Sequence, residues 1–417
     1  MAHDRTRLAG VVDVATAALH GGLATIQGVH SAIARKPFGP LRLAPVVGDV
    51  SNAVQVIHDG VTSVVYGGLR AAIAATGSVA RLAAGFVADG EQPRPGSPAD
   101  LAVAALNGFA GDRLAREGSP LATPMELRHL GRSLAIEPTA LAATFPHATS
   151  RLAVFVHGLG LNESWWQLHA ERHYGDRTTT HGSRLQADLG YTPLYLRYNT
   201  GLHVSDNGKQ FAQLLARVVA AWPMPVDEVI MIGHSMGGLV TRSACHYARE
   251  ANLDWVRLVR HIVFLGSPHL GAPLEKAVNV GAWLLGLVDV TRPLAEVVNG
   301  RSVGIKDLRF GSLRDEDWQG VDVDALLAGR TGDVPLLEGA AHYFVGATVT
   351  RDRRHPMGVV VGDLLVREAS AFGRGRLRRI QFPLEHGRHF GPMNHFELLN
   401  HPDVYEQMRR WLTGGAR

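Results

Sequence analysis

The sequence predicts an α/β protein with a mostly parallel central sheet that is covered by helices on both faces. Short apolar runs rich in β-branched residues predict strands, and segments with apolar residues at helical spacing lie between them. The predicted strands are 151–156, 193–198, 229–233 and 259–265, and a helix is predicted at 207–222. Strands that alternate with helices favour crossover connections, and therefore a parallel sheet. A sharp strand–turn–helix around Ser235 also supports this prediction.

The turn at Ser235 has the form Gly-x-Ser-x-Gly. It follows the apolar run Val-Ile-Met-Ile and precedes a segment of helical periodicity that begins at Leu239. Such a turn holds a serine in a strained conformation at the carboxyl edge of a sheet, so small residues are needed at Gly233 and Gly237. A glycine-rich loop that happens to contain a serine is the plainer interpretation. Because both the strand and the helix are present, we interpret Ser235 as a nucleophile.

The composition is that of a globular protein with a large core. The chain has 417 residues, of which 46% are hydrophobic and 19% are charged. At this length, two domains or one domain with large insertions are expected. The net charge of +4 is too small and too dispersed to indicate a nucleic-acid partner. Cys245 is the single cysteine, so an internal disulfide is excluded, and we expect it to serve in packing.

No segment has the pattern of a targeting peptide or a membrane span. The longest charge-free run near the start, residues 14–34, contains two histidines, a glutamine and three glycines. That composition is too polar for the hydrocarbon core of a bilayer. We therefore expect a soluble, cytoplasmic protein, and the sequence leaves its oligomeric state open.

Residues 1–95 are predicted to form an N-terminal helical region. Apolar residues step by three or four along 8–33 and 54–73, a further helix is predicted at 78–88, and a proline-rich linker follows at 91–98. Because the stripes are aliphatic and the opposite faces are poor in lysine, packing against the rest of the protein is favoured. The alternative is peripheral contact with a lipid or polymer surface.

The remainder divides into a transitional helical segment, 96–150, and a catalytic domain, 151–417. The transitional segment is predicted to hold helices at 99–106 and 125–134. Within the catalytic domain, the last two strands are predicted at 342–350 and 378–382, before a helix at 404–412. An insertion at about 274–339 is interpreted either as a cap over the active site or as ordinary core packing, and its polar stretches 301–309 and 315–318 as a solvated rim.

A nucleophilic serine requires a base, and the base requires a carboxylate that orients it. In this type of fold the chain order is serine, acid, histidine. The base should lie on a loop after the last strand, which leaves His386, His389, His395 and His401. His395 stands just ahead of the C-terminal helix and is our candidate.

Two carboxylates are candidates for the orienting acid. Asp352 lies among three arginines, which indicates a solvated charge cluster, whereas Asp363 has apolar flanks that would bury its carboxylate against an imidazole. We therefore favour Asp363. The developing oxyanion also requires N–H donors. Met236, next to the nucleophile, offers one, and Leu159, in the turn His-Gly-Leu-Gly after a strand expected beside the nucleophile strand, offers the second.

Five motifs resemble those of bacterial lipases of the α/β-hydrolase superfamily and of the related GPI inositol-deacylase-like family. They are His157-Gly-Leu-Gly160, Gly233-His-Ser-Met-Gly237, Gly266-Ser-Pro-His-Leu-Gly-Ala-Pro273, Gly362-Asp-Leu-Leu-Val366 and Met393-Asn-His395. The resemblance covers about residues 151–415 and implies the same triad of Ser235, Asp363 and His395. Lipases of this type often bind calcium near the histidine loop, where Glu397 would be one ligand. No second carboxylate is assigned, so no metal is predicted.

The sequence therefore predicts an α/β-hydrolase fold and a serine carboxylic-ester hydrolase, an esterase or lipase that acts on acyl esters or lipids without a cofactor. An acyltransferase would use the same triad but would require an alcohol acceptor in place of water. A non-catalytic protein that binds lipid or polymer surfaces would depend on the N-terminal helices instead. The sequence does not identify the natural substrate or its chain length.

Overall fold

The computed structural model describes residues 93–271, 302–320, 334–352, 363, 365–366, 368–374 and 379–414. The predicted helices within 1–92, and most of the insertion at 274–339, lie outside these described residues. In the part of the chain that is described, no helix is both long enough and apolar enough to cross a membrane.

An eight-stranded sheet forms the centre of the molecule, with the strand order β2-β1-β4-β3-β5-β6-β7-β8. Six of the strands are parallel, and the hairpin β1–β2 joins the edge of β4 in the antiparallel sense. The strands are β1 (Glu126–His129), β2 (Arg132–Ser133), β3 (Arg151–Val156), β4 (Thr192–Arg197), β5 (Glu228–His234), β6 (Val259–Leu265), β7 (Ala341–Ala347) and β8 (Gly387–Phe390).

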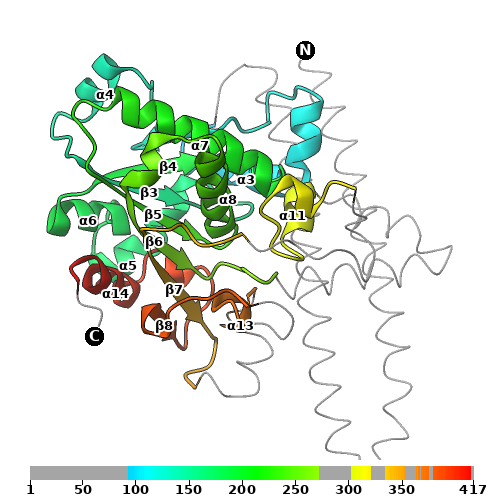
Figure 1. The fold of residues 1–417 in the computed structure, drawn as a ribbon. Coiled ribbons are helices and arrows are strands. Elements are labelled where there is room, and N and C mark those ends of the chain that lie inside the picture. The colour runs from blue at the N-terminus through cyan, green and yellow to red at the C-terminus, as the bar shows by residue number, and fades with distance from the viewer. Residues whose placement is uncertain are drawn as a thin grey trace, which may run out of the picture.

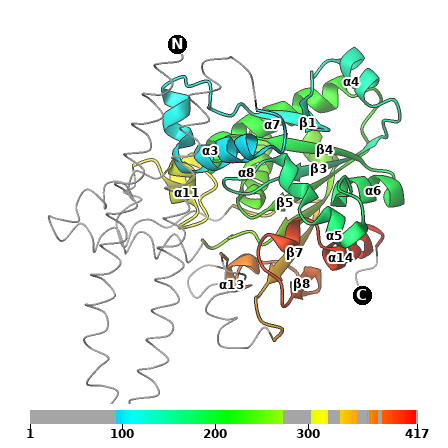
Figure 2. The ribbon, with the colours of Figure 1, turned by 180° about the vertical axis from the view of Figure 1, so that it is seen from behind.

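Helices cover both faces of this sheet (Figures 1 and 2). The α-helices are α3 (Pro98–Arg116), α4 (Pro138–Thr144), α5 (Ala170–Tyr174), α6 (His181–Leu189), α7 (Val204–Ala221), α8 (Met236–Glu250), α11 (Val303–Asp307), α13 (Glu368–Ala371) and α14 (Pro402–Leu412). Short 3-10 helices are η1 (Glu163–Gln167), η2 (Asp254–Leu258), η4 (Asp315–Asp317), η5 (Leu384–His386) and η6 (Glu397–Leu399).

Alternation along the central strands creates two cores. On β5, Val229 and Met231 point into a core shared with α7 and α8, whereas Ile230 and Ile232 point into a second core shared with α6 and α14. All four side chains are fully buried, which explains why the strand reads as a continuous apolar run. The strands predicted at 151–156, 193–198, 229–233 and 259–265 are confirmed to within one or two residues, as is the C-terminal helix.

The prediction of a helix at 125–134 was wrong, because this part of the segment 96–150 forms the hairpin β1–β2. The connecting residues Leu130 and Gly131 both have positive φ angles, 48° and 75°, as a two-residue hairpin turn requires. Backbone bonds to β4 hold the hairpin at the sheet edge, and the hydroxyl of Ser133 in β2 donates to the carboxylate of Glu126 in β1. Tertiary pairing therefore outweighs the local apolar spacing. The helix predicted at 99–106 is present but extends over all of α3.

The last strand was also misplaced. Residues 379–382 contribute only an isolated bridge between Arg374 and Arg379, and β8 at Gly387–Phe390 pairs with β7 instead. Gly387 allows this pairing, because a Cβ atom there would lie 2.4 Å from the ring of Phe344. A four-residue strand that opens with glycine carries little strand signal in the sequence.

The polar stretches 301–309 and 315–318 do not form a solvated rim. Ser302, Asp307, Arg309 and Asp317 are buried. Asp307 accepts hydrogen bonds from the backbone N–H of Val204 and contacts His203, so that α11 is tied to the start of α7. Polar residues here satisfy one another in the interior, an arrangement that composition alone does not distinguish from a solvated surface.

Candidate active site

Ser235 stands at the turn between β5 and α8, with φ 53° and ψ −124°. A positive φ is costly for a residue with a side chain, and such strain persists only where the surroundings fix it. Here the N–H of Ser235 donates to the carbonyl of Leu265 at the end of β6, and the carbonyl of Ser235 accepts from the N–H of Gly238. The side chain is only partly buried, at the carboxyl edge of the parallel strands.

The glycines of the turn are required by close backbone contacts. A Cβ atom on Gly237 would lie 2.2 Å from the carbonyl oxygen of Val156, and one on Gly233 would lie 2.6 Å from the Cα atom of Gly238. These neighbours are backbone atoms, so they cannot move aside as a flexible side chain could. The motif therefore packs the nucleophile turn directly against the end of β3.

His395 and Asp363 are brought together by the structure. Nδ1 of His395 lies 2.7 Å from Oδ2 of Asp363, and both side chains are almost fully buried. The other oxygen of the carboxylate, Oδ1, accepts from the N–H groups of Leu365 and Val366. The backbone N–H of His395 donates to the carbonyl of Asp363. The two segments are therefore joined through both side chain and main chain, which fixes the orientation of the ring.

The imidazole of His395 lies beside the nucleophile turn. A Cβ atom on Gly266 would lie 3.0 Å from Cε1 of His395, and the preceding carbonyl, that of Leu265, holds the N–H of Ser235. Nε2 of His395 is buried and makes no hydrogen bond to any described residue, so Ser235 Oγ is not bonded to it here. Catalytic hydrogen bonds of this kind are often long without substrate and shorten when substrate binds.

Two further histidines support the site in their neutral form. Nε2 of His234 lies 3.1 Å from the carbonyl oxygen of His395, and burial, together with nearby His395, holds the pKa of His234 well below its ordinary value. Burial also lowers the pKa of His157 to about 3. A neutral His234 can donate through Nε2, so it holds the backbone that carries His395.

The loop His157–Gly160 lies against Ser235. β3 pairs directly with β5, as the sequence predicted, and a Cβ atom on Gly158 would lie 3.0 Å from Cβ of Ser235. Met236 is the first residue of α8, and Leu159 is the third residue of the loop. The loop that contains Leu159 and the helix that begins at Met236 therefore both lie beside the nucleophile turn.

The other candidates lie elsewhere. Asp352 is exposed, in contrast to Asp363. Nδ1 of His386 lies 3.2 Å from the carbonyl oxygen of His342, Nε2 of His389 lies 2.9 Å from Oγ1 of Thr348, and His401 caps α14. Cys245 is a buried residue of α8 and packs into the core, as expected.

A calcium site near the histidine loop does not fit these residues. Oε2 of Glu397 accepts the N–H of Asn394 at 2.7 Å and so closes the turn that carries His395. Among the described residues, no group of three His, Cys, Asp or Glu side chains is arranged to hold a metal ion. We therefore derive no step through calcium.

A family model described as "PGAP1-like alpha/beta domain" matches residues 153–321, which include β3 to β6 and the turn at Ser235. The chain has the α/β-hydrolase fold. The resemblance to α/β-hydrolases that the motifs predicted is therefore confirmed. No curated protein sequence matches the chain at a significant level.

Solved structures similar to this chain include three with low sequence identity. A lipase from Bacillus licheniformis in its propeptide form is 18% identical, with 64% of this chain and 51% of that chain covered and a TM-score of 0.41. Phospholipase PlaB from Legionella pneumophila is 16% identical, with 54% and 46% covered and a TM-score of 0.32. A lipase-esterase related protein from Clostridium acetobutylicum is 15% identical, with 69% and 98% covered and a TM-score of 0.32. The matched region spans only about half the length of the first two.

Proposed function

We propose that this α/β-hydrolase is a serine carboxylic-ester hydrolase. The observation that carries the proposal is the buried hydrogen bond between His395 and Asp363 beside the strained turn at Ser235. A serine hydroxyl is a weak nucleophile, and a neighbouring imidazole whose other nitrogen faces a carboxylate is the arrangement that activates it. The buried ring of His395, with Nε2 unbonded, supports a role in accepting the hydroxyl proton.

In the proposed reaction, Oγ of Ser235 attacks the carbonyl carbon of an ester while Nε2 of His395 takes the hydroxyl proton. The carbonyl oxygen becomes an oxyanion that receives hydrogen bonds from the N–H groups of Met236 and Leu159. The tetrahedral intermediate then expels the alcohol, which takes the proton from His395, and leaves an acyl group on Ser235. Water attacks this acyl-enzyme while His395 takes a proton from it. The second tetrahedral intermediate then releases the acid, and His395 returns that proton to Oγ of Ser235.

Asp363 orients His395 throughout this cycle. It faces Nδ1 of His395, so it selects the tautomer in which Nε2 is free to accept a proton. It also stabilises the imidazolium that forms in each half of the reaction. No cofactor takes part in any of these steps, and the proposed substrate class is acyl esters, including lipids.

Initial rates with p-nitrophenyl esters of increasing acyl length test this proposal and define chain-length preference. We expect p-nitrophenol release in plain buffer, with a burst that matches the enzyme concentration if deacylation is slow. An acyltransferase with the same residues would release at most one equivalent of p-nitrophenol until an alcohol acceptor is supplied. Full-length protein that neither hydrolyses these esters nor transfers their acyl groups would contradict the proposal.

A further inference from the structure

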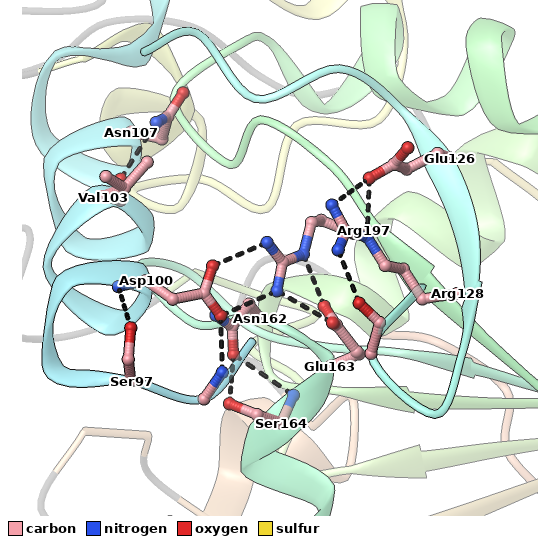
Figure 3. Close-up of polar contacts among 12 residues, drawn as sticks. Ser97, Asp100, Val103, Asn107, Glu126, Arg128, Asn162, Glu163, Ser164 and Arg197 are labelled. Atoms are coloured by element: carbon pink, nitrogen blue, oxygen red, sulfur yellow. Dashed lines mark hydrogen bonds and ion pairs between the residues drawn. The ribbon is translucent and has the colours of Figure 1, made fainter. Parts of the chain in front are cut away.

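Helix α3, which precedes the sheet in the chain, contributes to a buried cluster of charges (Figure 3). The cluster lies next to the end of the loop 157–160, which we call the oxyanion loop. Arg197, the last residue of β4, bonds Asp100 of α3 through both terminal nitrogens, at 2.7 and 2.9 Å. The same guanidinium bonds Glu163 through Nε at 2.6 Å and Nη2 at 2.8 Å. Glu163 begins η1, three residues after Gly160.

The polar atoms of this cluster are closely satisfied. Oδ2 of Asp100 also accepts from the N–H of Gly96 and from the side-chain amide of Asn162. Asp100, Glu163 and Arg197 are 3%, 8% and 8% exposed. Burial on its own would lower the pKa of Arg197, but the two carboxylates raise it above its ordinary value. The guanidinium is therefore a permanent cation that joins α3, β4 and η1, and bidentate bonds fix its geometry.

A second contact joins α3 to Gly160, the last residue of the loop. A Cβ atom on Gly108 of α3 would lie 2.8 Å from Cα and 3.0 Å from N of Gly160. The N–H of Gly160 donates to Oγ1 of Thr200, so the loop cannot move aside without losing that bond. The carbonyl of Gly108 accepts from Oγ of Ser302 at 2.6 Å, which holds the helix from its other side.

The loop is thus held between the helix and the nucleophile. Gly160 faces Gly108 of α3, and Gly158, two residues earlier, faces Ser235. The start of the loop is held by Tyr198, whose hydroxyl donates to the carbonyl of His157 at 2.7 Å. A shift of α3 would therefore move the N–H of Leu159 relative to Ser235. A misplacement of about 1 Å in an active site can lower the reaction rate by about 10²-fold.

We propose that Gly108 and the cluster of Asp100, Arg197 and Glu163 are positioning residues that hold the oxyanion loop 157–160 against Ser235. They touch no reacting atom, and they act by fixing the direction of the Leu159 N–H. The catalytic consequence of this inference rests on the proposed ester-hydrolase function. Its structural part, that α3 fixes the loop, stands on the contacts alone.

The test compares two buried helical glycines, and the control position is the more crowded: an added Cβ atom would lie 2.8 Å from its nearest neighbour at Gly108 and 2.1 Å at Gly208. Gly108→Ala places a methyl group against the backbone of Gly160, whereas Gly208→Ala in α7 places one against Ser243 of α8, away from the loop. Alanine is ordinarily a better helix former than glycine, so any loss of stability in either variant comes from crowding. Urea unfolding of both variants shows that they are compared as folded proteins.

Hydrogen–deuterium exchange reports on the loop without reference to catalysis. In Gly108→Ala, amides in a peptide spanning 157–163 should exchange at least about threefold faster than in the unmodified protein, because local opening becomes easier. Gly208→Ala should leave that peptide unchanged. Unchanged exchange in Gly108→Ala would overturn the proposal. Arg197→Lys keeps the charge but loses the bidentate bonds to Asp100 and Glu163. It should therefore also speed exchange of the peptide 157–163, by a smaller factor than Gly108→Ala. If it does not, the cluster has no positioning role.

Kinetics on p-nitrophenyl butyrate then test the consequence for the reaction. Gly108→Ala should lower kcat by about 10- to 100-fold with KM within about threefold, since oxyanion contacts form in the transition state. Gly208→Ala should keep kcat within about twofold. Faster loop exchange with unchanged kcat would overturn the positioning role. If the unmodified protein is inactive and resists fluorophosphonate, the proposed function fails, and the catalytic half of this inference fails with it. The exchange data alone then decide whether α3 holds the loop.

Discussion

Nδ1 of His395 lies 2.7 Å from Oδ2 of Asp363, although 32 positions separate the two residues in the chain. The carboxylate is fixed by two backbone N–H groups at its other oxygen, and the histidine is fixed by a main-chain bond to the same aspartate. An imidazole held in this way has one tautomer available when neutral. This relationship is the basis of the first prediction.

Asp363→Asn should lower kcat for ester hydrolysis by roughly 10²–10⁴, because the amide no longer stabilises the imidazolium and favours the wrong tautomer. Asp352→Asn is the matched control, since Asp352 is exposed, and its rate should stay near that of the unmodified protein. Steady-state kinetics of both purified variants make the comparison. A large loss in Asp352→Asn together with an active Asp363→Asn would transfer the role of the acid to Asp352.

Stability should fall as the pH is lowered from about 6.5 toward 3. Burial lowers the pKa of His157 and of His181 to about 3, and of His342 to about 4. An unfolded histidine has a pKa near 6.5. Between these values the unfolded state binds more protons than the folded state, so the free energy of unfolding decreases as pH falls. Each such histidine contributes a slope of up to about 1.4 kcal/mol per pH unit.

Urea midpoints measured from pH 7.5 to 4.5 check this dependence. His181→Gln is the informative variant, because glutamine can still donate toward the carbonyl of Leu398 but does not titrate. Its stability should fall less steeply with acid than that of the unmodified protein. Equal slopes for the two proteins would mean that His181 is not kept neutral by the fold.

Removal of the region before α3 should affect solubility and access more than chemistry. A chain that starts at Pro93 keeps the N–H of Gly96 and the whole of α3, and therefore the buried pair of Asp100 and Arg197. We expect lower solubility. The aliphatic stripes predicted within 1–92 are expected to pack against the rest of the protein, so their removal would expose apolar surface. Its soluble fraction should still hydrolyse short esters.

A chain that starts at Ser119 is the contrasting truncation. It leaves Arg197 buried with one carboxylate instead of two, and exposes the loop surface that Gly108 covers. Loss of a buried partner typically costs about 3–5 kcal/mol, so this protein should be insoluble or inactive.

A folded but inactive protein starting at Pro93 would show that the N-terminal region itself builds part of the site. A greater loss on long-chain than on short esters would indicate that it helps to engage a surface.

The central strands and the nucleophile turn could be predicted because their signals are local. The apolar run of β5, the glycines around Ser235 and the helical spacing of α8 all lie within about twenty residues of one another. The hairpin at β1 could not be predicted, because its strands are short and its pairing with β4 is a tertiary contact. β8 was missed for the same reason.

The buried charge cluster carried no sequence signal. Asp100 and Arg197 are 97 positions apart, and each stands in a segment whose composition is ordinary. A single sequence does not distinguish an aspartate in the first turn of a solvated helix from one that bonds a buried arginine. The polar stretches at 301–309 and 315–318 were misjudged in the same way, since Asp307, Arg309 and Asp317 are buried.

The most direct test of the account is covalent labelling of Ser235. A fluorophosphonate should react with the full-length protein in a 1:1 ratio, abolish ester hydrolysis, and leave its mass on the tryptic peptide that contains Ser235. Folded Ser235→Ala should lose both labelling and activity, with a fall in kcat of about 10⁴-fold or more. Labelling at another residue, or a folded Ser235→Ala that keeps most of its activity, would contradict the assignment of the nucleophile and the mechanism built on it.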